Sequence, residues 1–489
     1  MIEKMSSYTK IVATIGPASE SYEIIRSCIE AGVRVIRLNF SHGTAEEQLL
    51  RLQHVRKISE ELQIPIAILQ DLQGPKIRIG QLQESSYHLD KGQTIILTSE
   101  SIIGDKKRVS IDYPSLSEEI SIGSRILIDD GLIALRVTGV DHKEIHCVVE
   151  EGGTLRARKG VNLPNVPLKH LSSFTEKDKR DLNFAFEHDV DYVALSFVRS
   201  ASDVAALRTY MNTTYKREIP IISKIEKPEA VEDLQGIIAQ SSAIMVARGD
   251  LGVEMYPEEV PLIQKSIIRS CLSAGLPVIT ATQMLESMMN NPRPTRAETN
   301  DVANAVLDGT SAVMLSGESA AGKHPLGAVE TMRRIVVHTE QSAEFKHLVH
   351  EQSLNKEHVD MARKRSTTDA VGLATREIAL ATKAVLIICF TYSGNTARLI
   401  SKYRPSTPVI ALSPIESTVR RLALSWGVRP FLIEHLSSID ASLEYAEQFV
   451  KEHHLAKQGD TVVVTAGVPV GEPGKTNMVK VMEIGKLIV

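Results

Sequence analysis

Cysteine, aromatic side chains and net charge are all scarce in this chain of 489 residues. Its four cysteines lie far apart, without a CxxC pair or the spacing of a metal site, and this predicts reduced, buried thiols in a cytoplasmic protein. The formal charge of -4 gives no overall attraction to nucleic acid or to an anionic membrane, so neither is an expected partner. The sequence also lacks an apolar N-terminal segment, a run long enough to span a bilayer, and short-period repeats. We therefore expect neither secretion, nor membrane insertion, nor a repeat array.

Eight apolar runs of strand length recur along the chain, each followed by a stretch with helical periodicity. The runs span residues 10–15, 33–40, 65–72, 192–197, 220–226, 243–248, 277–283 and 312–317. Between them, apolar residues recur at three-and-four spacing in stretches such as 46–62, 229–238 and 260–274. Eight such units predict an α/β fold of the (β/α)8 TIM-barrel type, whose active site lies at the C-terminal ends of the strands.

Two further regions have a different pattern of apolar and polar residues. Between the third and fourth units, residues 73–168 contain short alternating runs and the turns Asp130-Gly131 and Gly152-Gly153, which predict a small antiparallel β barrel placed as a lid. Near the C-terminus, strand-like runs at 384–390, 408–412, 429–433 and 461–465 predict a separate α/β domain. The expected domains are a catalytic barrel of residues 1–72 and 169–345, a lid of residues 73–168, and a C-terminal regulatory domain of residues 346–489.

Charged side chains follow directly where two of the barrel runs end. One run ends at Lys224 and Glu226, and the next is followed by Asp250. Parallel strands are covered on both faces, so charge at their ends indicates a ligand site. Two carboxylates beside a lysine suit a divalent cation next to a phosphate, because the carboxylates hold the metal and the ammonium neutralises the remaining negative charge. From these residues alone, a buried ion pair that closes the barrel mouth is the alternative.

The chain resembles the pyruvate kinase family from Thr9 to its C-terminus. Seven segments carry the resemblance: 9–19, 37–43, 159–164, 223–226, 247–252, 281–288 and 294–298. The pattern is similar to that of bacterial members that work without potassium. The resemblance implies transfer of the phosphoryl group of phosphoenolpyruvate to ADP, giving ATP and pyruvate in glycolysis. It also implies Mg2+ or Mn2+ as cofactor, a lid, and a homotetramer.

The family resemblance also implies roles for the residues at the strand ends. Glu226 and Asp250 match the metal ligands, and Lys224 and Arg37 match residues that face the phosphoryl group. Thr282 and the backbone N–H groups of Gly249 and Asp250 match the groups that bind the substrate carboxylate in the family. Thr282 also matches the residue near C3 of the enolate, although either this hydroxyl or a chain of waters could deliver the proton. Members commonly have serine where this chain has Asn300, which puts a proton relay through that position in doubt.

The nucleotide side of the site is inferred from the same resemblance. The matching positions are Asn39, Phe40, Ser41, His42, Arg78 and Lys159. Lys159 is expected on the returning edge of the lid. For His42, a direct nucleotide contact and a structural role both remain open.

The expected potassium site departs from the potassium-dependent pattern. The monovalent-cation positions are occupied by Asn39, Ser41, Asp71 and Leu72. Four residues of the same segment differ from those of potassium-dependent members: Leu72, Gln73, Lys76 and Ile79. The ammonium of Lys76 can supply the single charge that K+ otherwise provides, so K+ is not an expected requirement. Asn39, Ser41 and Asp71 could instead hydrogen-bond Lys76 or still bind a cation weakly.

A loop of the C-terminal region resembles the family's site for a sugar-phosphate effector. It contains Thr391, Ser393, Gly394, Asn395 and Thr396, and joins a strand to a probable helix. Hydroxyls and backbone N–H groups at such a junction can hold the phosphate of a sugar phosphate or nucleotide, whereas a capped turn is the plain alternative. Residues 467–476, with Gly471, Gly474 and Lys475, are expected to form the second half of the site.

Two other functions are alternatives to phosphoryl transfer. A barrel aldolase or lyase acting on a 2-oxo acid also uses a Glu and Asp pair to hold a metal, but C–C cleavage needs no ADP clamp such as Arg78 and Lys159. A non-catalytic regulatory paralogue is disfavoured because Arg37, Lys224 and Thr282 are all intact.

Overall fold

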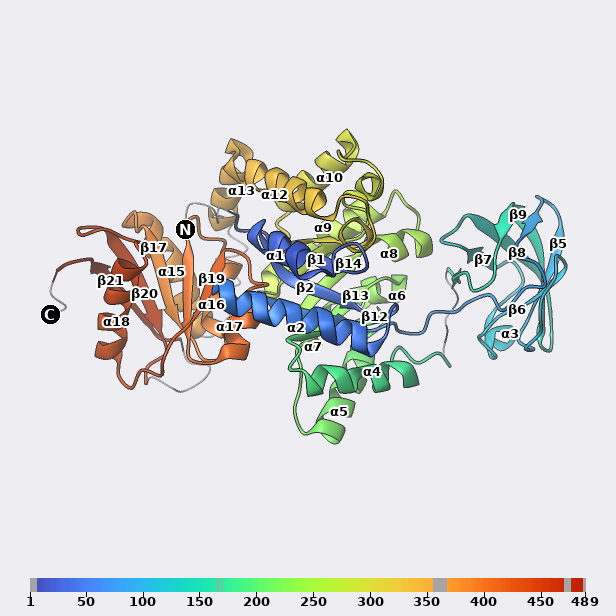
Figure 1. The fold of residues 1–489 in the computed structure, drawn as a ribbon, viewed down its shortest axis with the longest axis horizontal. Coiled ribbons are helices and arrows are strands. Elements are labelled where there is room, and N and C mark those ends of the chain that lie inside the picture. Colours follow the sequence, from blue (N-terminus) through green and yellow to red (C-terminus); the bar gives the residue numbers. More distant parts are fainter. Residues whose placement is uncertain are drawn as a thin grey trace.

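The computed structural model describes residues 7–354, 367–469 and 476–486, apart from 165, 167 and 169. It contains three bodies, with the lid and the C-terminal domain at opposite ends of a central barrel (Figure 1). Among the described residues, no helix has the length and apolar character needed to cross a membrane.

The central body is a closed barrel of eight parallel strands, in the order β1-β16-β15-β14-β13-β12-β3-β2. All eight predicted strands are confirmed, with bounds that differ by at most two residues at either end. They are β1 (Lys10–Ile15), β2 (Val33–Asn39), β3 (Ala67–Asp71), β12 (Tyr192–Val198), β13 (Ile221–Ile225), β14 (Ala243–Ala247), β15 (Val278–Ala281) and β16 (Ala312–Leu315).

Helices cover the outside of the barrel. They are α1 (Tyr22–Glu30), α2 (Ala45–Leu62), α4 (Glu176–Glu187), α5 (Ala201–Tyr215), α6 (Pro228–Glu232), α7 (Leu234–Gln240), α8 (Arg248–Glu254), α9 (Val260–Ala274), η1 (Glu286–Met289), α10 (Arg296–Leu307), α11 (Gly317–Ala320), α12 (Pro325–Gln341) and α13 (Ala343–Leu354). The single helix predicted over 229–238 is two helices, because Asp233 leaves the helical conformation and its side chain accepts a hydrogen bond from the Ala201 N–H at 2.7 Å.

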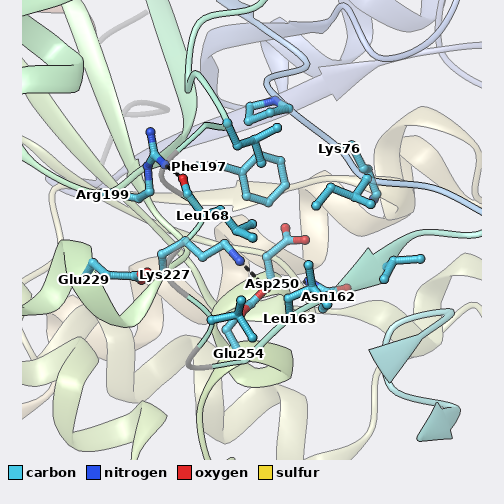
Figure 2. Close-up of a pocket in the computed structure, with 15 residues that line it drawn as sticks. Lys76, Asn162, Leu163, Leu168, Phe197, Arg199, Lys227, Glu229, Asp250 and Glu254 are labelled. Atoms are coloured by element: carbon cyan, nitrogen blue, oxygen red, sulfur yellow. Dashed lines mark hydrogen bonds and ion pairs between the residues drawn. The ribbon is translucent and has the colours of Figure 1, made fainter. Parts of the chain in front are cut away.

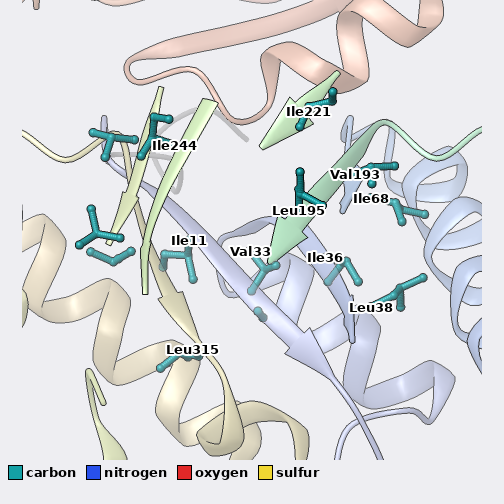
Figure 3. Close-up of a cluster of buried hydrophobic side chains, with 14 of the residues drawn as sticks. Ile11, Val33, Ile36, Leu38, Ile68, Val193, Leu195, Ile221, Ile244 and Leu315 are labelled. Atoms are coloured by element: carbon teal, nitrogen blue, oxygen red, sulfur yellow. The ribbon is translucent and has the colours of Figure 1, made fainter. Parts of the chain in front are cut away.

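Successive barrel residues point to two different cores, which explains why the strands are apolar throughout. Ile68, Val193 and Ile244 belong to the cluster between strands and helices, part of which Figure 3 shows. Their neighbours Leu69, Ala194 and Met245 fill the barrel interior. Charged side chains thus lie toward the strand ends, and those at the C-terminal ends form the candidate site.

The lid is confirmed as an all-β body, but its six-stranded sheet is a curled half-barrel that does not close. The sheet order is β11-β7-β8-β9-β5-β6, with β4 and β10 paired separately. Residues 78 and 79 lie between the two edge strands of this sheet. They form one isolated β-bridge to Gly160, beside β11, and one to Ile111, beside β6, and these two bridges do not make a strand that closes the barrel. The elements are β4 (Tyr87–Leu89), β5 (Thr94–Thr98), β6 (Arg108–Ser110), α3 (Leu116–Glu119), β7 (Arg125–Ile128), β8 (Ile133–Asp141), β9 (Glu144–Glu151), β10 (Gly153–Leu155) and β11 (Val161–Asn162).

The C-terminal body is an α/β sheet of order β19-β18-β17-β20-β21, which confirms the predicted class. Its elements are α15 (Thr367–Ala381), β17 (Leu386–Phe390), α16 (Asn395–Lys402), β18 (Val409–Ser413), α17 (Glu416–Leu422), β19 (Val428–Leu432), α18 (Ile439–Glu452), β20 (Thr461–Ala466) and β21 (Met478–Glu483). The antiparallel edge strand β21 was not predicted. This body contacts the base of the barrel, where Arg420 of α17 pairs with the buried Asp191 at 2.7 Å.

Candidate active site

Four charged side chains meet at the C-terminal ends of β2, β3 and β13. The Lys224 ammonium lies 2.9 Å from Glu226 Oε1 and 3.4 Å from Asp71 Oδ1. Arg37 Nε donates to Asp71 Oδ2 at 2.7 Å, and Arg37 Nη1 donates to the Thr14 hydroxyl at 3.0 Å. The Lys224 side chain keeps 12% of its surface exposed, so the cluster is buried but reachable from the barrel mouth.

Burial and the neighbouring charges act in opposite directions on these groups. Burial lowers the pKa of Lys224, but Asp71 and Glu226 outweigh it and raise that pKa above its usual value. Burial raises the pKa of Asp71, but Lys224 and Arg37 outweigh it and hold that pKa below its usual value. The site therefore keeps a permanently charged ammonium at its centre, as stabilisation of an anionic group requires.

Glu226 has an oxygen available for a further ligand. Its Oε2 accepts a hydrogen bond from the Phe197 N–H at 2.6 Å, whereas the buried Oε1 has no hydrogen-bond partner among the described residues. Lys224 forms an ion pair with Oε1 at 2.9 Å. Burial raises the pKa of Glu226, and nearby Asp250 adds to this effect while Lys224 opposes it. A divalent cation between Glu226 and Asp250 would give Oε1 a ligand and would offset the repulsion between the two carboxylates. The residues present therefore fit the metal.

These two carboxylates form a pair rather than a complete metal cage. Within the described residues no group of three or more His, Cys, Asp or Glu is arranged to hold a metal ion. Asp250 lines a pocket between barrel and lid, with Lys227, Asn162 and Glu254 around it (Figure 2). A metal held by such a pair takes its other oxygens from substrate and water, as Mg2+ commonly does at phosphate sites.

Thr282 is held in a conformation that a β-branched residue rarely adopts. Its φ is +67°, and the next residue, Gln283, has a φ of +53°. The Thr282 hydroxyl accepts a hydrogen bond from the Gly249 N–H at 2.7 Å, and Arg248 Nη2 donates to the Thr282 carbonyl at 2.7 Å. Helix α8 and the end of β15 thus place the threonine hydroxyl beside the backbone expected to bind a carboxylate. Strained backbone of this kind is concentrated at functional sites.

The expected nucleotide residues lie on two bodies. Asn39 ends β2 and His42 lies three residues later, and Gln48 Nε2 donates to the backbone carbonyls of both. Burial lowers the pKa of His42, and the charges of Arg78, Lys76 and Arg37 lower it further. Lys159 lies on the lid and pairs there with Asp129 at 2.8 Å.

Several residues at the site were not predicted from the sequence. The Ser196 hydroxyl accepts a hydrogen bond from Lys224 at 2.9 Å, and Phe197 binds Glu226 through its backbone. Phe197 has a φ of +53°, and a serine followed by an aromatic residue in an apolar run gives no signal of this turn. Asn162 of the lid donates to Glu254 Oε1 at 2.9 Å, and Lys227 pairs with the same oxygen at 2.5 Å. The sequence alone cannot show that Asn162, Lys227 and Glu254 contact one another.

Comparison with known proteins agrees with this architecture. The family models described as "Pyruvate kinase, barrel domain" and "Pyruvate kinase, alpha/beta domain" match residues 6–329 and 369–482. The chain belongs to the pyruvate kinase family.

Individual relatives of the family match nearly the full length. A pyruvate kinase of Geobacillus stearothermophilus is 44% identical over 486 residues, covering 99% of this chain and 81% of that protein. One from Sporosarcina psychrophila is 46% identical over 482 residues, covering 98% and 81%. A crystal structure of a pyruvate kinase from Cryptosporidium parvum is 37% identical, with a TM-score of 0.91 and coverage of 98% and 96%.

The loop that resembles the pyruvate kinase effector site runs from β17 into α16. The Gly394 N–H donates to the Thr391 hydroxyl at 3.0 Å, and Gly394 has a φ of +81°, where glycine is favoured. The hydroxyls of Thr396 and Thr476 are 2.7 Å apart, which joins the two expected halves of the site. Gly471, Gly474 and Lys475 lie outside the described residues. Asn300, the position of the doubtful proton relay, is exposed on α10.

Proposed function

We propose that this chain transfers the phosphoryl group of phosphoenolpyruvate to ADP, giving pyruvate and ATP in glycolysis. The observation that carries the proposal is the buried ammonium of Lys224, 2.9 Å from a Glu226 oxygen that has no hydrogen-bond partner among the described residues. A transferring phosphoryl group spreads its charge over three oxygens, and fixed cations stabilise that charge. Family membership supports the same reaction.

The proposed roles divide the reaction between neighbouring side chains. Glu226 and Asp250 hold Mg2+ or Mn2+, which supplies positive charge to the phosphate when bound. Arg37 grips two phosphate oxygens and Lys224 stabilises the group in transit. The bond from phosphorus to the enol oxygen breaks as the bond to the ADP oxygen forms. The enolate then takes a proton at C3 on the side of Thr282.

The nucleotide is proposed to lie between β2 and the lid. Asn39, Phe40, Ser41 and His42 would contact it from the barrel, and Arg78 and Lys159 from the lid. Lys159 would exchange Asp129 for the nucleotide when the lid closes. The ammonium of Lys76 is proposed to replace K+ beside Asn39, Ser41, Asp71 and Leu72. Its charge lowers the pKa of His42, which follows Asn39 and Ser41 in the chain, and this supports the proposal.

The proposal extends to the whole chain. We propose a catalytic barrel of residues 1–72 and 169–345, a lid of residues 73–168 and a regulatory domain of residues 346–489. A sugar phosphate or nucleotide would bind the loop of Thr391, Ser393, Gly394, Asn395 and Thr396. Four copies would form a homotetramer.

Replacing Lys224 by methionine tests the function. In an assay coupled to lactate dehydrogenase, the wild-type protein should form pyruvate only when both phosphoenolpyruvate and ADP are present. Lys224→Met should lose about a thousandfold in kcat while still binding phosphoenolpyruvate, because the ammonium acts mainly in the transition state.

Three outcomes would contradict the proposal. Near-normal turnover of the mutant would remove the role of Lys224. Cleavage of a 2-oxo acid without ADP would favour the lyase, and substrate binding without turnover in the wild-type protein would favour the regulatory paralogue.

A further inference from the structure

A second cluster of cations lies at the other end of the barrel, where its base meets the C-terminal domain. A cavity there is lined by residues that precede β15 and β16 and by residues around α16, including Arg398, Lys402, Arg404, Ser425 and Trp426. Among its described lining residues there is no Asp or Glu. The cavity is on the opposite side of the barrel from the candidate active site.

Arg404 is the buried cation of this cavity. It is only 4% exposed, and its guanidinium lies over the Trp426 ring at 4.4 Å from the centroid. Arg404 Nη2 donates to the Gly309 carbonyl at 2.6 Å and lies 3.4 Å from the Ser311 hydroxyl. The Nε and Nη1 atoms are buried without a hydrogen-bond partner among the described residues. Three N–H groups of a charged side chain are therefore left to be satisfied.

The other two cations of the cavity have partners. Lys402 donates to Asp369 at 2.9 Å, and Arg398 Nη2 donates to the Ser393 carbonyl at 3.2 Å. Burial lowers the pKa of Arg404 to about 9, so the guanidinium stays protonated at neutral pH. The charge of Glu340 raises that pKa but does not outweigh burial, and no carboxylate among the described residues pairs directly with the guanidinium. A buried charge that is compensated only in part is destabilising, and stacking on an indole offsets only part of that cost.

The cavity is small enough to select its occupant. The free volume open to a water-sized particle is about 10 Å3, which is about what one water needs. A phosphate, with four oxygens around phosphorus, is too large for this space. A single-atom anion satisfies both the size and the charge, whereas water satisfies only the size.

We propose that this cavity binds one monatomic anion of halide size at Arg404. The site draws on both bodies, because Gly309 and Ser311 belong to the barrel whereas Arg404 and Trp426 belong to the C-terminal domain. The anion would therefore stabilise the contact between the two. It is separate from the proposed effector loop, which lies at the N-terminal end of α16.

Thermal unfolding in halide and in gluconate tests the site, because gluconate is too large to enter. At constant ionic strength, replacing 100 mM sodium gluconate by sodium bromide should raise the Tm of the wild-type protein by about 2 °C or more. Arg404→Gln and Ser425→Val, which fills the cavity and keeps the arginine, should each lose this dependence. Arg156→Gln, at an exposed position of the lid, is the matched control and should keep it.

Diffraction from wild-type crystals grown in bromide provides a measurement that needs no variant. An anomalous bromide peak within about 3.5 Å of Arg404 Nε or Nη1 is expected. A water, a polyatomic anion or no density at this place would overturn the proposal. An undiminished bromide effect in Ser425→Val would do the same, even if Arg404→Gln failed to fold.

Discussion

At the scale of single residues, the proposed metal pair makes the most direct prediction. Glu226→Gln and Asp250→Asn replace an anionic oxygen by a neutral one of similar shape, so each should weaken Mn2+ binding by about tenfold or more without unfolding the chain. Titration of Mn2+ followed by electron paramagnetic resonance measures this. Glu232→Gln, on the exposed side of α6, is the matched control. Unchanged affinity in both site variants would place the metal elsewhere.

Lys76 makes a second prediction at this scale. The wild-type protein should turn over at nearly full rate with tetramethylammonium as the only monovalent cation. Lys76→Glu replaces a positive by a negative charge in a partly desolvated site, so it should be nearly inactive without K+ and partly rescued by K+. Lys91→Glu, exposed on the lid, should behave like the wild type. A strong K+ requirement of the unmutated protein would refute the substitution.

At the scale of elements, the contact between β11 and α8 connects the lid to the metal site. Asn162 of β11 binds Glu254, which lies one helical turn after Asp250 and pairs with Lys227, the neighbour of Glu226. Removing the amide with Asn162→Ala costs a hydrogen bond to a charged group, worth about 1.5–3 kcal/mol.

The variant Asn162→Ala should therefore raise the KM for ADP by about tenfold or more, with smaller effects on Mn2+ affinity and on the free energy of unfolding. Asn162→Gln should recover part of the loss. Gln93→Ala removes a hydrogen bond within the lid and serves as the control. An unchanged KM for ADP in Asn162→Ala would show that this contact does not position the lid.

The elements also show what a sequence can and cannot predict. The change from apolar to charged residues at Lys224 and Asp250 predicts a site, because a parallel strand is covered on both faces and is otherwise apolar. Ser196 and Asn162 gave no such signal, since their importance depends on partners 28 and 92 residues away. Strand β21 was missed because its burial is only partial, as at other edge strands. The lid was expected to close, but closure depends on the lengths of its edge strands, which alternation does not specify.

At the scale of the whole molecule, a chain of contacts joins the effector loop to the barrel. Thr418 of α17 donates to the Tyr392 carbonyl at 2.8 Å, and Arg420 of the same helix pairs with Asp191, which also pairs with Arg56 of α2 at 3.0 Å. Binding of a phosphorylated metabolite to the loop should lower the KM for phosphoenolpyruvate, and phosphoenolpyruvate should in turn tighten binding of the metabolite.

Replacing Thr391, Ser393 and Thr396 together by alanine should abolish this activation and leave the maximal velocity unchanged. Steady-state kinetics with a panel of sugar phosphates and nucleoside monophosphates measures the effect. A variant with Thr382→Ala and Ser437→Ala removes exposed hydroxyls elsewhere in the same domain and should still respond. Full activation of the triple variant would exclude the loop as the site.

The lid interrupts the chain without interrupting the barrel, because β3 pairs directly with β12 on the far side of the insertion. Every proposed phosphoryl-binding group stands on the barrel, whereas the lid supplies Arg78 and Lys159 to the nucleotide and Lys76 in place of K+. Mutations in the lid can therefore accumulate under different selection from those in the barrel. Nucleotide preference can diverge among descendants of this gene while the chemistry at Lys224 is inherited unchanged.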